Sequence, residues 1–108
     1  MRTAPLLFVL LLGGCAAAYH TPSDGRLTSK INAAYRERDA CLAHSVQAEG
    51  QALDPAVAAR AAAASCQAET DRLIELVNRD GDPKVAARIR QDSEFRATGM
   101  AVKARSQG

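Results

Sequence analysis

The residues after position 28 show helical periodicity in three segments, 29–49, 54–79 and 82–104. In the first segment one face collects mainly apolar residues: Ile31, Ala34, Tyr35, Cys41, Leu42, Ser45 and Val46. In the second segment the corresponding face consists of Ala59, Ala62, Cys66, Leu73, Leu76 and Val77. Recurrence every three or four residues is typical of amphipathic helices. We therefore predict an all-α fold whose first two helices form an antiparallel hairpin.

The third helical segment has a less regular face. Arg88, Asp92, Arg96 and Lys103 lie among the residues of this face, which are Val85, Ile89, Phe95, Gly99, Met100 and Val102. A helix that faces a core carries a continuous apolar stripe. We therefore expect the third helix to pack shallowly on the hairpin, so that truncation after Gly81 would leave the hairpin helical.

The expected ends of these helices carry suitable capping residues. An Asp-Pro pair starts the second and the third helix, because aspartate accepts hydrogen bonds from free N–H groups and proline has no N–H to satisfy. Glycine ends the first and the second helix, since it readily adopts the left-handed conformation there. These residues are Asp54-Pro55, Asp82-Pro83, Gly50 and Gly81, with Thr28 or Ser29 as the first cap.

The first eighteen residues form a separate segment with the order of a secretory signal peptide. Arg2 is followed by an unbroken apolar run over residues 6–12 and then by small residues. The apolar run is much shorter than the roughly 20 residues that cross a bilayer. We therefore expect export, with residues 19–27 as a polar tether that contains Pro22 and Gly25.

The end of the apolar run carries a more specific motif. Leu12-Gly13-Gly14-Cys15 resembles the lipobox of bacterial lipoproteins. The resemblance implies cleavage before Cys15 and attachment of acyl chains, such as palmitate, to that residue. The protein would then face the periplasm from a membrane of the cell envelope. In such lipoproteins an aspartate after the cysteine favours the inner membrane, so Ala16 implies the outer membrane where the host has both.

Two divisions of the chain follow from the two cleavage sites that the motif allows. Lipoprotein processing gives a signal peptide over residues 1–14, a lipid-anchored tether over 15–27 and a helical domain over 28–108. Ordinary signal peptidase cleavage after Ala18 would instead release a soluble periplasmic or secreted protein, because Ala16-Ala17-Ala18 is an acceptable small-residue site.

Export would place Cys41 and Cys66 in an oxidising compartment, where two such cysteines favour one disulfide. In an antiparallel hairpin that turns near residues 52–54, the numbers of facing residues sum to about 107, and 41 + 66 gives 107. The same register sets Arg38 opposite Glu69. A bridge over a loop of this length stabilises a protein by about 3 kcal/mol.

Charge is distributed unevenly along the chain. Residues 19–82 contain 7 basic and 10 acidic residues, whereas residues 83–108 contain 6 basic and 2 acidic ones. The candidate binding residues are therefore the basic residues of the third helix: Lys84, Arg88, Arg90, Arg96, Lys103 and Arg105. They either complement the acidic hairpin or contact an anionic surface or an acidic partner protein. The overall charge of +2 argues against a nucleic-acid binder.

No catalytic or metal-binding pattern is present in the sequence. His20 lies in the tether, and His44 is not followed by a histidine or cysteine three or four residues later, so we expect no metal or cofactor. Ser45 and Ser65 face no evident base. We expect a non-enzymatic cell-envelope lipoprotein that serves as a structural or protein-interaction module, and a soluble binding or inhibitor protein is the alternative. The alanine-rich second helix would also permit close approach of a second copy.

Overall fold

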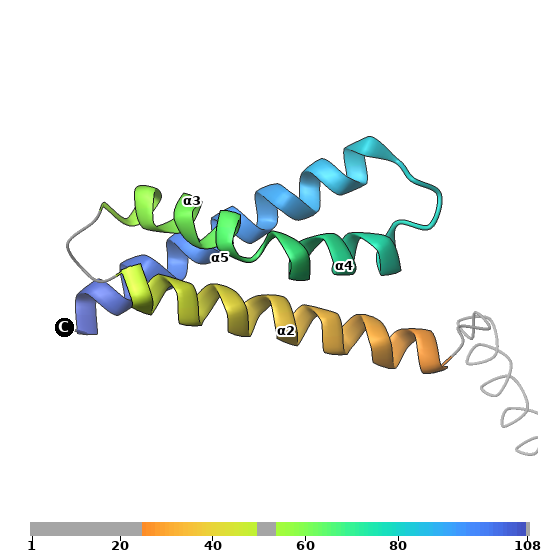
Figure 1. Cartoon of the computed structure of the whole chain (residues 1–108), viewed down its shortest axis with the longest axis horizontal. Helices are drawn as coiled ribbons and strands as arrows, with labels where there is room; N and C mark the ends of the chain where they lie inside the picture. Colours follow the sequence, from red (N-terminus) through yellow and green to blue (C-terminus); the bar gives the residue numbers. More distant parts are fainter. Residues whose placement is uncertain (1–24, 50–53, 108) are drawn as a thin grey trace, which may run out of the picture.

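The computed structural model describes residues 25–49 and 54–107, and all regular structure in these two ranges is helical. The helices are α2 (Gly25–Glu49), α3 (Pro55–Ser65), α4 (Gln67–Val77) and α5 (Pro83–Gln107). Together α3 and α4 return antiparallel to α2, and α5 crosses behind them to the far end of α2 (Figure 1). The predicted all-α fold is therefore confirmed.

The helix starts after the Asp-Pro pairs form as predicted. The Asp54 carboxylate accepts a hydrogen bond of 2.8 Å from the N–H of Ala56, and α3 begins at Pro55. The Asp82 carboxylate accepts one of 2.9 Å from the N–H of Lys84. The predicted stop of the second helix at Gly81 is wrong, because α4 ends at Val77 with Asn78 as its C-cap, and Gly81, with a φ of 69°, lies in the following turn before α5. Gly50 lies outside the described residues.

The predicted start of the first helix is wrong. Helix α2 begins at Gly25, so residues 25–27 belong to the helix and not to the tether. Arg26 and Leu27 are good helix formers, and Leu27 is half-buried, which gives the additional turn a packing contact. Neither Thr28 nor Ser29 therefore caps the helix. The remaining tether residues lie outside the described part of the chain.

The predicted second helix is divided in two. Cys66 lies between α3 and α4 with φ −105° and ψ 23°, well away from the α-helical values near −63° and −42°. The N–H of Cys66 still donates to the carbonyl of Ala62, and its own carbonyl accepts from Thr70. The break therefore redirects the helix at the bridged cysteine without separating the two halves. No glycine or proline marks it in the sequence.

The Cys41–Cys66 disulfide is formed, as predicted. The two sulfur atoms are 2.05 Å apart, and the two Cα atoms are 5.9 Å apart. This contact fixes α2 against the junction of α3 and α4. The predicted register of the hairpin is therefore confirmed at this position.

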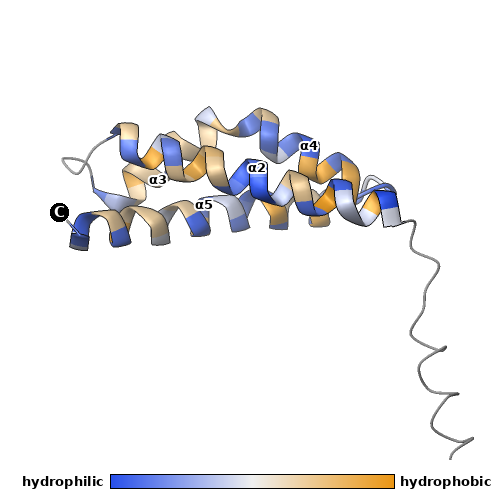
Figure 2. Ribbon diagram, turned by 90° about the horizontal axis from the view of Figure 1, so that it is seen from below, coloured by the Kyte–Doolittle hydropathy of each residue, from blue (hydrophilic) through white to orange (hydrophobic). Residues whose placement is uncertain are grey.

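The hydrophobic core is built largely from alanine. Its buried members are Leu42, Val46, Ala58, Ala59, Ala62, Cys66, Ala97 and Ala101. Small side chains allow helices to approach closely, and this compensates for the few large apolar residues. Hydrophilic and hydrophobic turns alternate along α5, in keeping with its mixed sequence (Figure 2).

The expected shallow packing of the third helix is wrong. Helix α5 packs against α2, α3 and α4, and it supplies Ala97 and Ala101 to the core, with Ala97 fully buried. The buried face of α5 consists of small residues, Ser93, Ala97 and Ala101. Its largest side chain, Phe95, remains 77% exposed. Close helix approach selects small residues for the centre of the interface, so the pattern of large residues missed them and included the exposed Phe95 and Val102, although Met100 packs against the core.

Candidate functional site

The six predicted binding residues all lie on α5 with exposed side chains, and the structure separates them into two sets. Arg90 is 3.6 Å from the carboxylate of Asp71 on α4. Arg96 is 3.5 Å from that of Asp39 on α2 and donates a 2.9 Å hydrogen bond to Asp92. These two arginines therefore complement the acidic hairpin, as one of the two sequence interpretations proposed.

The other four basic residues form no ion pair within the described part of the chain: Lys84, Arg88, Lys103 and Arg105. Their charges are left for solvent or a ligand. Intramolecular complementarity therefore accounts for only part of the basic excess of α5.

Two of these residues share a face with exposed apolar side chains. At 100° per residue, Lys84, Arg88, Phe95 and Val102 point within a narrow sector opposite the buried Ser93 and Ala97. Phe95 is 77% exposed and Val102 is 52% exposed. We call these four residues the outer α5 face. Gly99 lies between the two apolar residues and adds no side chain there.

The outer α5 face is basic at one end of the bundle. Helix α5 begins at the end of the bundle where α2 also begins (Figure 1). Lys84 and Arg88 occupy this first part of α5, and Lys30 in the first turns of α2 is also exposed. The apolar pair, Phe95 and Val102, lies further along α5.

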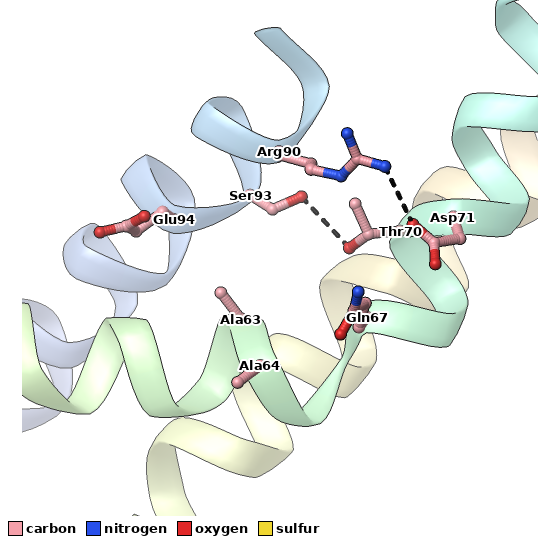
Figure 3. A pocket seen from close by; sticks show the side chains of 8 residues that line it. All are labelled: Ala63, Ala64, Gln67, Thr70, Asp71, Arg90, Ser93 and Glu94. Atoms are coloured by element: carbon pink, nitrogen blue, oxygen red, sulfur yellow. Dashed lines mark hydrogen bonds and ion pairs between the residues drawn. The ribbon is translucent and has the colours of Figure 1, made fainter. Parts of the chain in front are cut away.

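A groove between α3, α4 and α5 is the second surface feature (Figure 3). Arg90 reaches across it to Asp71, and the Ser93 and Thr70 hydroxyl oxygens are 3.4 Å apart at its floor. Ser93 also donates a 3.1 Å hydrogen bond to the carbonyl of Ile89. These side chains use their polar groups within the protein, so the groove presents no assembled nucleophile and base among the described residues.

A buried polar cluster around Arg38 crosses the bundle. The Arg38 side chain is 0% exposed, and two of its nitrogens donate to one oxygen of Asp39 at 3.0 and 3.1 Å. Its third nitrogen lies 3.2 Å from Asp92 and donates to the Ser93 hydroxyl at 3.3 Å. The guanidinium also lies 5.3 Å from the centroid of the Tyr35 ring. The expected pairing of Arg38 with Glu69 is therefore wrong.

The third helix explains why Arg38 turns away from Glu69. Asp92 of α5 lies on the open side of the hairpin and supplies a carboxylate that a two-helix register does not contain. Arg96 shares this carboxylate, and its pKa is raised by the hydrogen bond to Asp92 and by the negative charges of Asp92 and Asp39. In the sequence, Arg38 lies on an otherwise apolar helix face. This position indicates that the arginine is buried, but it does not identify the partner of its charge.

The disulfide adjoins an unusual carboxylate. One carboxylate oxygen of Glu69 lies within 4.8 Å of both the Cys41 and the Cys66 sulfur atoms. Its Oε2 atom is buried and has no hydrogen-bond partner among the residues that the structure describes. Of the other predicted residues, His44 is solvent-exposed, while Cys15 and His20 lie outside the described residues.

Comparison with known proteins identifies no relative. No known protein family matches the chain, and neither a curated protein nor a solved structure matches it significantly. Among the described helices, none has the length and apolar character needed to cross a membrane.

Proposed function

We propose that this chain is a non-enzymatic cell-envelope lipoprotein, anchored through Cys15, whose helical bundle is a structural module held against the membrane surface. The observation that carries the proposal is the outer α5 face, where Lys84 and Arg88, which form no ion pair with a described residue, share a face with the exposed side chains of Phe95 and Val102. Cationic residues attract anionic headgroups, and apolar side chains enter the interface beside them.

The position of this face favours the membrane as its ligand. Lys84 and Arg88 lie in the first turns of α5, which begins at the end of the bundle where α2 also begins (Figure 1). An anchor at that end would keep the basic residues close to the headgroups. Lipid attachment and a basic patch are two signals that together give stable, oriented membrane binding. An acidic partner protein is the competing ligand of the same face.

Replacement of the anchor cysteine tests the first part of the proposal. The Cys15→Ala variant is expected to lose acylation and to move from the membrane fraction to the soluble fraction, because no other lipid attachment site follows the apolar run. Intact-mass measurement of the mature protein and fractionation of cell envelopes check this. A wild-type N-terminus at Tyr19 without lipid would instead support the alternative, a soluble periplasmic or secreted binding or inhibitor protein.

Charge removal from the outer α5 face tests the second part. In the Cys15→Ala background, Lys84→Gln with Arg88→Gln is expected to weaken binding to phosphatidylglycerol vesicles about 30-fold at low salt, since each basic residue contributes about 1 kcal/mol near an anionic surface. The matched control is Arg36→Gln with Arg60→Gln, which removes the same charge from exposed positions on α2 and α3. Vesicle co-sedimentation measures both affinities.

The outcomes of this experiment show whether the outer α5 face binds the membrane surface or another ligand. Binding that weakens with salt and is absent on phosphatidylcholine vesicles supports the membrane surface. Equal losses in the two double variants would show that overall charge, and not this face, determines the affinity. Absence of binding to either vesicle type would overturn the membrane assignment.

A further inference from the structure

The disulfide region contains three metal-ligating groups from three parts of the fold. Cys41 comes from α2, Cys66 from the junction of α3 and α4, and Glu69 from the first turn of α4. Their two sulfur atoms and one carboxylate oxygen all lie within 4.8 Å of one another. The cysteines are 25 residues apart in the sequence, so no short motif reveals the cluster.

The Glu69 carboxylate has no structural role that explains its position. Its Oε2 atom is buried without a hydrogen-bond partner in residues 25–49 and 54–107, and a buried polar atom of this kind is costly. The neighbouring disulfide has no proton to donate. Arg38, the fully buried cation of the bundle, directs its nitrogens to Asp39, Asp92 and Ser93. A ligand that requires the reduced cysteines would give this oxygen a partner.

We propose that reduction of the Cys41–Cys66 disulfide creates a site for a thiophilic divalent cation of the Zn²⁺ class. A dithiol reductant supplies two electrons and two protons, becomes a disulfide itself and leaves two thiols on the protein. The cation then displaces both thiol protons and binds two thiolates. The Glu69 carboxylate is the third ligand, and water is the fourth.

The geometry requires a local change only. In a tetrahedral zinc site with Zn–S distances of about 2.3 Å, the two sulfur atoms lie about 3.8 Å apart. The fold already holds the Cα atoms of the two cysteines 5.9 Å apart. The Ser45 hydroxyl, 3.4 Å from the Cys66 sulfur, is positioned to hydrogen-bond to a thiolate. Oxidation would re-form the disulfide and release the cation, so the site would be gated by redox state.

Cobalt is a suitable spectroscopic probe of this site. The full chain with Cys15→Ala, which retains two thiols, is reduced and titrated with Co²⁺ without oxygen. We expect one equivalent to produce a thiolate-to-cobalt charge-transfer band and the strong visible bands of tetrahedral cobalt, and Zn²⁺ to remove both. The disulfide form should produce neither. Absence of these bands in the reduced protein would overturn the proposal.

Two glutamate variants distinguish the folded site from a pair of free thiols. Glu69→Gln should weaken Co²⁺ binding at least about tenfold, the lower limit seen when even an outer partner of a metal ligand is removed. Glu75→Gln changes an exposed glutamate on the same helix and should bind like the parent chain. Equal affinities in the two variants would exclude Glu69 as a ligand and overturn the site.

If reduction of the disulfide unfolds the chain, circular dichroism still distinguishes metal binding at a folded site from binding by unfolded chain. Metal binding at a folded site stabilises the native state and raises the melting temperature. We therefore expect Co²⁺ to restore or raise helicity in the reduced parent chain and in Glu75→Gln, and less so in Glu69→Gln. Metal binding without any gain in helicity or melting temperature would show coordination by unfolded chain and contradict the proposal.

Discussion

Truncation of the chain after Gly81 is expected to abolish cooperative unfolding of the remaining hairpin, even with the Cys41–Cys66 disulfide intact. The deletion removes α5, which supplies Ala97 and Ala101 to the core. It leaves the apolar face of α3 and the inner side of α2 open to water. A two-stranded helical hairpin with a core made largely of alanine buries too little apolar surface to offset its conformational entropy.

Urea unfolding followed by circular dichroism at 222 nm, about the wavelength of the helical minimum, measures this effect. The full-length bundle should show one sigmoidal transition, whereas the truncated hairpin should lose helicity gradually from zero denaturant. The matched control is truncation after Arg105, which removes exposed residues at the end of α5 and should retain the transition. A sharp transition in the hairpin alone would show that α5 is dispensable, as its mixed sequence first suggested.

Local chemistry determined which features the sequence could predict. The Asp54 and Asp82 caps depend on residues two positions away, and both formed as expected. The disulfide depended on a hairpin register, which two cysteines and a short turn define. These features require little knowledge of the rest of the fold. Sequence patterns within one helix or one hairpin are therefore sufficient to predict the two caps and the disulfide.

The buried face of α5 depends on what surrounds it. Ser93, Ala97 and Ala101 are small and carry little hydrophobic signal, whereas Phe95 and Val102 carry much. Close packing against the alanine-rich α3 favours the small residues at the interface. A pattern search that follows large apolar side chains therefore includes the face of α5 that carries Phe95 and Val102, which the structure exposes, although Met100 packs against the core. The exposure of that face is also what makes it a candidate binding surface.

The partners of Arg38 show the same limit in the polar interior. A hairpin register could place this arginine only opposite α4, where Glu69 was the obvious carboxylate. In the structure, α5 brings Asp92 and Ser93 next to this arginine. The guanidinium forms an ion pair with Asp92 and a hydrogen bond with Ser93. Glu69 is then left with a buried oxygen that has no hydrogen-bond partner in the described part of the chain. The wrong prediction that Arg38 pairs with Glu69 therefore concerns two features of the site, the partners of Arg38 and the buried oxygen of Glu69.

Replacement of Arg38 with alanine is expected to cost about 3–4 kcal/mol of unfolding free energy. The side chain is 0% exposed, so its removal leaves a cavity at the centre of the bundle and deletes hydrogen bonds to Asp39 and Ser93. Asp39 and Asp92 would lose a buried cation, but they are 33% and 42% exposed and remain partly hydrated. The loss therefore arises mainly from packing and from the hydrogen bond to Ser93, whose hydroxyl retains its bonds to Ile89 and Thr70.

Two further variants separate volume from charge in this effect. Arg38→Met retains most of the volume without the charge, and we expect it to lose about 1–2 kcal/mol, because solvent can stabilise the two aspartates. Arg36→Ala, at an exposed position on the same helix, should change stability by less than about 0.5 kcal/mol. Urea midpoints of the three disulfide-bonded variants provide the comparison. If Arg38→Ala matched Arg36→Ala, the Arg38 cluster would have no part in holding α5 to the hairpin, and the deletion of α5 would have to act through its alanines alone.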